Sequence, residues 1–191
     1  MRASVMTIIV LAGTGFFAVG CSQSALPTAP TAALSIAPAI GGSATASPVR
    51  PAAAQKEVPF KGRMEGVDSD SDFIPGQSVV VTTEGTGNAT ELGYFSFKQR
   101  VTVFFATGTD VGTTSWVAAN GDTLETTVAG SGQLIGPEEI SITDHHTITG
   151  GTGRFAGAQG TFTVDRVARA VAPLTTSGSF DGTITSPGSS H

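Results

Sequence analysis

The chain has 191 residues and a net charge of −5, with 25 glycines, 11 phenylalanines, one tryptophan and one cysteine. Only 13% of the residues are charged, and all 15 acidic residues lie from Glu57 onward, against seven basic ones. This acidic region repels a phosphate backbone and contains no basic patch, so the composition argues against nucleic-acid binding. The single cysteine excludes an intramolecular disulfide, so an exported domain of this sequence must rely on its core.

Residues 1–20 are predicted to form a signal peptide. Arg2 precedes a run of mainly apolar residues, Val5 to Val19, which is short for a membrane span of roughly 20 residues. The run ends in Ala18-Val19-Gly20-Cys21, which resembles the lipobox of bacterial lipoproteins, although Ala18 stands where leucine is usual. The resemblance implies cleavage before Cys21 and lipidation of that cysteine. An ordinary signal peptide cut at the same bond, leaving Cys21 unmodified, is the alternative.

Residues 21–56 are predicted to form a disordered linker behind the lipidated cysteine. Residues 22–56 contain 11 alanines, five prolines, five serines and three threonines, with no aromatic or acidic residue. Such a segment buries too little apolar surface to offset its ordering entropy. We therefore expect a tether to a membrane of the cell envelope, which is the outer membrane or cell surface in a diderm host. Residues 187–191 are expected to form a short disordered tail.

Residues 57–186 are predicted to form one all-β domain, because apolar and polar residues alternate with a period of two. Phe95 and Phe97, for example, alternate with Ser96 and Lys98. Eight antiparallel strands of this kind close readily into a barrel, and a β-sandwich is the alternative. The strands are expected near residues 57–66, 77–86, 92–105, 110–119, 122–134, 138–149, 158–170 and 175–185.

The glycine-rich segment Gly150–Gly160 reads Gly-Gly-Thr-Gly-Arg-Phe-Ala-Gly-Ala-Gln-Gly. It resembles a turn of the allene oxide cyclases and dirigent proteins, and the segment 178–184 is compatible with these families. The resemblance covers about 40 residues and implies an eight-stranded barrel. It implies no catalytic residue, because none can be matched by motif. The segment is no phosphate-binding loop, because no Lys-Ser or Lys-Thr follows it.

The strand expected at 138–149 carries the best candidate for a functional site. Asp144 and His146 share a face with three isoleucines, and Arg166 shares a face with Phe162 in the next strand. We therefore expect a polar group of Asp144, His146 and Arg166 inside the barrel, where burial shifts pKa values and histidine can act in acid–base chemistry. The alternatives are a bulge that turns these groups to solvent and a purely structural ion pair. The candidate ligand-binding residues are Phe104, Trp116, Asp144, His146 and Arg166.

Other motifs argue against metal, cofactor or nucleophile chemistry. The acidic run Asp68–Asp72 lacks the glycine and distal glutamate of an EF-hand, so we interpret it as a solvated loop. His145 and His146 have no third histidine or cysteine nearby to complete a zinc site. The sequence contains no Gly-x-Ser-x-Gly elbow and no cofactor motif. Tyr94 falls on the polar face of its strand, so an exposed position is expected.

Three functions remain open. The favoured hypothesis is a non-catalytic envelope lipoprotein whose barrel binds a small apolar ligand or a partner. The second is a cyclase or isomerase that acts on a flexible apolar substrate inside the barrel, as the family resemblance implies. The third is a purely structural surface protein with a filled core. Fold alone does not decide among them.

Overall fold

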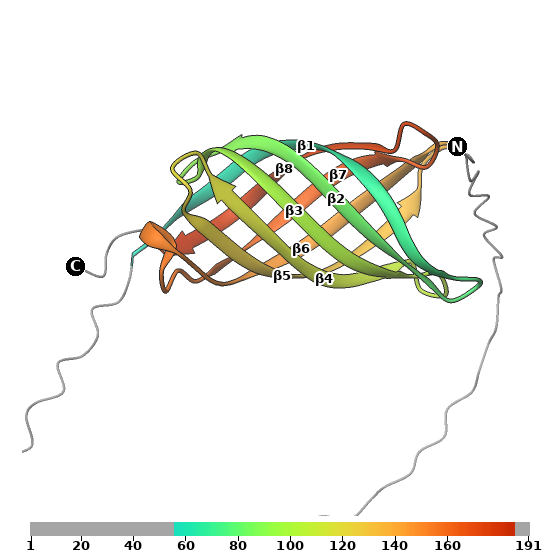
Figure 1. Cartoon of the computed structure of the whole chain (residues 1–191), viewed down its shortest axis with the longest axis horizontal. Coiled ribbons are helices and arrows are strands. Elements are labelled where there is room, and N and C mark those ends of the chain that lie inside the picture. The colour runs from blue at the N-terminus through green and yellow to red at the C-terminus, as the bar shows by residue number, and fades with distance from the viewer. Residues whose placement is uncertain (1–55, 186–191) are drawn as a thin grey trace, which may run out of the picture. The chain divides into compact units, whose positions relative to one another are not determined.

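The computed structural model describes residues 56–185, which form an all-β domain with one short 3-10 helix (Figure 1). The predictions made for residues 1–20, most of 21–56 and 187–191 lie outside the described residues. No helix within the described part of the chain is long and apolar enough to cross a membrane. The elements are β1 Glu57–Ile74, β2 Ser78–Ala89, β3 Gly93–Phe104, β4 Thr109–Ala118, β5 Thr123–Leu134, β6 Glu139–Gly151, η1 Gly153–Phe155, β7 Gly160–Arg169 and β8 Thr175–Thr185.

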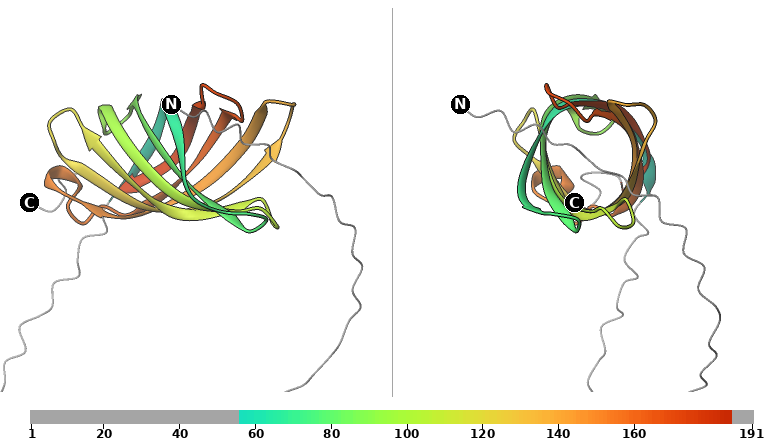
Figure 2. Two further views of the ribbon diagram at one scale, coloured as in Figure 1. Left: turned by 45° about the vertical axis from the view of Figure 1, so that its right-hand side comes forward. Right: turned by 90° about the vertical axis from the view of Figure 1, so that its right-hand side faces the viewer.

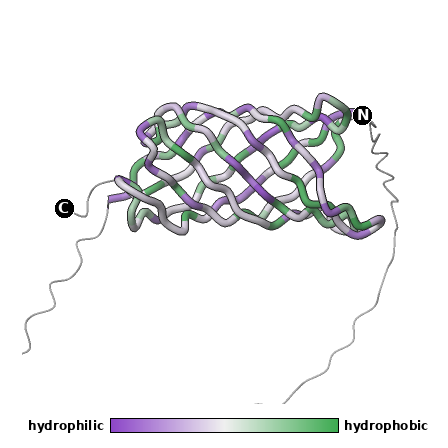
Figure 3. The backbone as a smooth tube through the Cα atoms, in the orientation of Figure 1, coloured by the Kyte–Doolittle hydropathy of each residue, from purple (hydrophilic) through white to green (hydrophobic). Residues whose placement is uncertain are grey.

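The eight strands form a closed antiparallel barrel, as predicted, and not a sandwich. Each strand pairs with its neighbours in sequence, and β8 pairs back with β1 from Glu57↔Thr185 to Val67↔Thr175. The view along the barrel shows the closed ring (Figure 2). Hydrophobic and hydrophilic residues alternate along the strands (Figure 3), because successive side chains point into and out of the barrel.

β1 is longer than predicted, since the acidic run Asp68–Asp72 belongs to the strand and is not a solvated loop. In the register with β2, Asp68 pairs with Thr83 and Asp70 with Val81. The prediction was wrong because aspartate and serine are uncommon in strands. Here a valine-rich partner strand pairs with the backbone, and the Thr83 hydroxyl donates a hydrogen bond of 2.5 Å to Asp68. The correction places the Asp68 side chain beside the buried Thr83, inside the barrel.

The barrel has two different ends. We call one the η1 end, where the chain enters β1 at Glu57 and leaves β8 at Thr185, and the other the polar end. In Figure 1 the η1 end lies to the left and the polar end to the right. The turns at the η1 end are residues 90–92, 119–122 and 152–159, and those at the polar end are 75–77, 105–108, 135–138 and 170–174.

Aromatic side chains fill the half of the barrel next to the η1 end. Trp116 lies among them, with its ring centroid 5.2 Å from that of Phe95 and 5.6 Å from those of Phe162 and Phe180. An eight-stranded barrel is just wide enough for its side chains to fill it. The largest fully buried side chains in this half are Trp116, Phe60, Phe95, Phe155, Leu92, Leu124 and Ile184.

The glycine-rich segment closes the η1 end. It forms the turn between β6 and β7, and Phe155 of η1 is fully buried in the aromatic core. Gly153 has φ = 54°, and a Cβ added there would overlap the Asp122 carboxylate. Both constraints require glycine. Gly153 therefore allows both the turn and the close approach of the Asp122 side chain.

Candidate functional site

A layer of polar side chains crosses the barrel interior between the aromatic core and the polar end. Its members come from seven different strands, so the layer exists only when the barrel is closed. Buried polar groups cost free energy unless they are hydrogen-bonded, so the partners of each member decide what the layer can do. The members are Asp68, Thr83, Gln99, Asp110, Asp144, Arg166 and Thr176.

Asp144 and Arg166 form a buried ion pair at the centre of this layer. The Arg166 guanidinium donates from Nε to Asp144 Oδ2 at 3.1 Å, and the two side chains are 3% and 0% exposed. Gln99 donates to the same oxygen at 3.2 Å from across the barrel, and Arg166 Nη1 donates to the Thr176 hydroxyl at 3.3 Å. The structure thus brings two of the three predicted site residues together. The alternative of a bulge that turns these groups to solvent is wrong, because Asp144 and His146 are buried and pair regularly with β5, and the register shift lies farther along, at Glu125/Thr126.

Gly130 of β5 leaves the space that the Asp144 carboxylate occupies. Gly130 pairs in register with Asp110 on one side and Asp144 on the other. A Cβ added to Gly130 would overlap Asp144 Oδ1 and lie 3.0 Å from Asp110 Oδ2. Two carboxylates from different strands therefore converge on one position that carries no side chain.

Asp110 is the least satisfied charged group of the layer. It is 4% exposed, and its Oδ1 has no hydrogen-bond partner among residues 56–185. Asp144 Oδ1 likewise has none. Burial, reinforced by the nearby Asp144 carboxylate and opposed by Arg166, raises the pKa of Asp110 to about 6. Burial also raises the pKa of Asp68, although the hydrogen bond from Thr83 opposes the shift.

His146 points inward, as predicted, but it joins the aromatic core. Its ring stacks on Phe162 with centroids 4.6 Å apart, and its Nδ1 lies 3.0 Å from the Thr126 hydroxyl. Its Nε2 is buried without a partner in the described residues. Burial, which outweighs the Asp144 carboxylate, lowers the pKa of His146 to about 4. The imidazole is therefore neutral near pH 7, and no hydrogen bond of the described residues connects it to the ion pair.

The other predicted ligand-binding residues lie in two different environments. Trp116 is buried in the aromatic core, and its Nε1 donates to Thr126 at 3.3 Å. Phe104 is 40% exposed and belongs to the outward-facing set of β3, so it does not line the interior. This position gives no support to a ligand-binding role for Phe104 inside the barrel, because the odd-numbered residues form the inward face of β3. Tyr94 is exposed, as expected.

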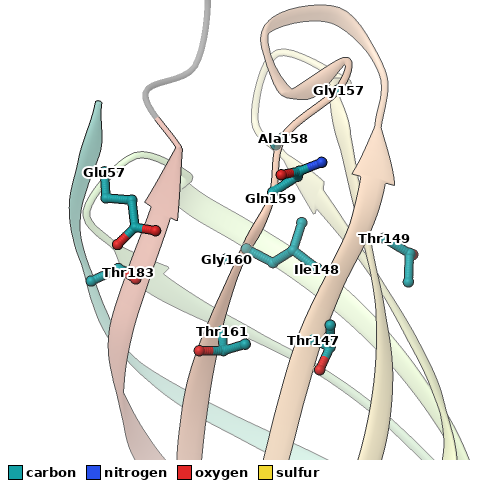
Figure 4. Close-up of a pocket in the computed structure, with 10 residues that line it drawn as sticks. All are labelled: Glu57, Thr147, Ile148, Thr149, Gly157, Ala158, Gln159, Gly160, Thr161 and Thr183. Atoms are coloured by element: carbon teal, nitrogen blue, oxygen red, sulfur yellow. The ribbon is translucent and has the colours of Figure 1, made fainter. Parts of the chain in front are cut away.

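Two hollows open between strands at the barrel wall. One, of about 550 Å³, lies where β6 and β7 diverge near the η1 end and is lined by Thr147, Thr161, Thr183 and Gln159 among others (Figure 4). A second, of about 810 Å³, is lined mainly by residues of β7, β8, β1 and β2, and its lining includes the buried Arg166 of the polar layer. Neither hollow is lined by Asp110, Asp144, Thr114 or His146, whose buried polar atoms lack a partner in the described residues.

Sequence reasoning missed five of the seven members of the polar layer, including the hydroxyl residues Thr83 and Thr176. Gln99 lies between Phe97 and Val101 on the apolar face of β3, and Asp110 shares the Trp116 face of β4 by period two. Asp68 was missed because its strand was ended too early. A polar residue on an apolar strand face is the signal that would have found Gln99 and Asp110. No group of three or more His, Cys, Asp or Glu residues within 56–185 is placed to hold a metal ion.

A comparison with solved structures finds the same fold. The structure described as the pterocarpan synthase dirigent protein GePTS1 superposes with a TM-score of 0.53 and 12% sequence identity, covering 72% of this chain and 89% of that chain. At this identity the likeness shows the fold alone, so the barrel is dirigent-like, as the segment Gly150–Gly160 implied. No family model matches the sequence, and no curated protein matches it.

Proposed function

We propose that this protein is an exported lipoprotein of the cell envelope whose barrel binds a small molecule at its polar end without transforming it. The observation that supports the ligand most is the pair of buried carboxylate oxygens without partners, Asp110 Oδ1 and Asp144 Oδ1. An orphaned buried acceptor costs roughly 1–3 kcal/mol, which a ligand donor would recover. The dirigent-like barrel, a fold whose interior accommodates either side chains or one small ligand, is compatible with this role.

The polar end is the part of the interior that is partly exposed to solvent. At the η1 end the described side chains are closely packed around Trp116 and Phe155. At the polar end, Val81, Val103 and Ile142 point inward but stay only half-buried. A ligand would enter there and lie on the polar layer, rather than deep in the aromatic core as the apolar-ligand hypothesis requires.

The anchor is supported by the sequence, since Cys21 lies outside the described residues. The lipobox-like residues that end in Cys21 and the long segment before Glu57 fit a lipid anchor followed by a tether. Because the chain enters the barrel at the η1 end, the tether joins the end opposite the proposed ligand site.

Mass spectrometry of the protein purified from its producing cells tests both parts of the proposal. An N-terminal Cys21 that carries acyl chains is expected, and a Cys21→Ala variant should lack them. Under native conditions a small-molecule adduct should be present, and it should be released on unfolding. An unmodified Cys21 would refute the anchor, and loss of every adduct together with no binding of added small molecules would refute the ligand site.

A cyclase or isomerase is the second candidate, and the state of Asp110 favours it. A buried carboxyl with a pKa of about 6 holds a proton close to neutral pH and can act as a general acid. The structural neighbour is called a synthase, which places the same fold in an enzyme. Turnover of a flexible unsaturated substrate that is lost in Asp110→Asn would establish catalysis. Binding without product in the same assay would favour the carrier role.

A further inference from the structure

The inward-facing side chains at the polar end carry an excess of negative charge. Asp68, Asp70, Asp110 and Asp144 belong to the inward-facing sets of their strands, and Arg166 is the one cation among the inward positions of residues 56–185. Arg166 uses Nε for Asp144 and Nη1 for Thr176. The other three carboxylates form no salt bridge with a described residue. Several uncompensated charges in one partly desolvated space are unfavourable unless a cation or a proton joins them.

Two buried polar groups without hydrogen-bond partners distinguish this negatively charged interior from an ordinary acidic surface. Asp110 is 4% exposed, and its Oδ1 lacks a partner in the described chain. The Thr114 hydroxyl, two inward positions along β4, is also buried without a partner. The fold supplies no donor to either group. A ligand that fits must therefore bring hydrogen-bond donors and positive charge.

The side chains around Asp110 favour an organic cation as the ligand. An anion is repelled, and a neutral apolar molecule would leave the carboxylates unpaired. A bare metal ion lacks a set of three suitable ligands within residues 56–185. An ammonium group offers three donors and a compact charge. Val103, which pairs in register with Asp110, and Ile142, which pairs with Gly132, provide an apolar wall beside the carboxylate.

We propose that the polar end binds a primary alkylammonium ion, with its ammonium group on the Asp110 carboxylate and its hydrocarbon chain against Val103 and Ile142. This inference rests on the proposed function, because it names the class of ligand for the same site. Asp68 and Asp70, which form no salt bridge with a described residue, add to the attraction, whereas the charge of Asp144 is compensated by Arg166. The aromatic core below limits the depth, so the chain of the ligand extends toward solvent.

Isothermal titration calorimetry of the full mature protein at pH 7.5 with three matched probes tests the proposal. The probes are n-hexylammonium, hexan-1-ol and hexanoate, which share a chain and differ in charge. We expect n-hexylammonium to bind about tenfold or more tightly than either of the others, since charge-assisted hydrogen bonds to a buried carboxylate are strong. Hexan-1-ol or hexanoate binding as tightly would overturn the ligand class while leaving the proposed ligand site standing. Absence of binding by all three would count against both.

Variants locate the ammonium group. Asp110→Asn keeps the shape and removes the charge, and should weaken n-hexylammonium about tenfold or more. Asp181→Asn, at an exposed carboxylate paired with Lys61 on the outer face, removes the same charge and should leave the affinity unchanged. Asp68→Asn should weaken binding by a smaller factor, and keeps the test valid should Asp110→Asn fail to fold. Equal affinity in Asp68→Asn, Asp110→Asn and the control would refute the proposed site.

Discussion

Replacing Gly130 by alanine tests whether the polar layer depends on the space that this glycine leaves for the Asp144 carboxylate. The added methyl would overlap Asp144 Oδ1 and would lie 2.9 Å from the Thr143 carbonyl oxygen. The carboxylate must therefore move, which breaks its contacts of 3.1 Å with Arg166 and 3.2 Å with Gln99. Overpacking costs about 1–3 kcal/mol, and a buried charge left without its partner about 3–5 kcal/mol. Because β5 can relax in part, we expect the free energy of unfolding to fall by about 2–4 kcal/mol.

Gly132→Ala is the matched control, on the same strand and the same face. Its added methyl would overlap no atom, since it would lie 3.2 Å from Ile140 Cγ2, 3.4 Å from Ile142 Cγ1 and 3.8 Å from the Ser141 carbonyl oxygen. The change should alter stability by no more than about 1 kcal/mol. Urea unfolding followed by fluorescence of Trp116, the single and buried tryptophan, measures both variants. Equal stability of the two variants would show that the Asp144 carboxylate does not depend on the space at Gly130.

Three further predictions concern titration and packing. The pKa of His146 is lowered to about 4 in the folded protein, so the natural protein loses stability as the pH falls from 6.5 to 4, on the order of 3 kcal/mol in total. His146→Phe lacks this titrating group and should lose less stability over the same pH range. Asp110→Asn should show the opposite difference: the natural carboxyl, with its folded pKa raised to about 6, gains stability as the pH falls from 6 toward 3.8, and the variant should lack this gain in acid-unfolding curves. Phe155→Ala should lower the free energy of unfolding by about 3–5 kcal/mol in the same urea assay, since a fully buried ring is lost from the η1 end, and a change below 1 kcal/mol would show that the ring is dispensable.

The barrel could be predicted from the sequence because its strands obey one simple rule. Period two separates inside from outside along most of the chain, and glycine-rich turns mark the ends of several strands. The rule also placed Asp144, His146 and Arg166 inside. It failed at Asp68, where polar residues on both faces hide the alternation, whereas Phe104 lies on the outward face that the rule gives it.

The partners of the inward residues could not be predicted in the same way. Which side chains meet across a barrel depends on the register of all eight strands and on the bulge at Glu125/Thr126. Gln99 and Asp144 are 45 residues apart in the chain and touch only because the ring closes. His146 was grouped with Asp144 on spacing alone, whereas the closed barrel stacks it on Phe162. The spacing of residues along a strand predicts which face of the strand a side chain lies on. Closure of the barrel decides which other side chains it contacts.

Asp110 differs from the Asp144–Arg166 pair in what it contributes to folding. Asp144 and Arg166 compensate each other's charge within the barrel, so removing either partner leaves a buried charge and costs stability. Asp110 has no such partner among the described residues, and burial penalises its ionised form. Its carboxylate therefore opposes folding near neutral pH, while a purely structural barrel would be served better by an apolar residue at this position. A group that costs stability and faces the accessible end of the barrel is where binding should be sought first.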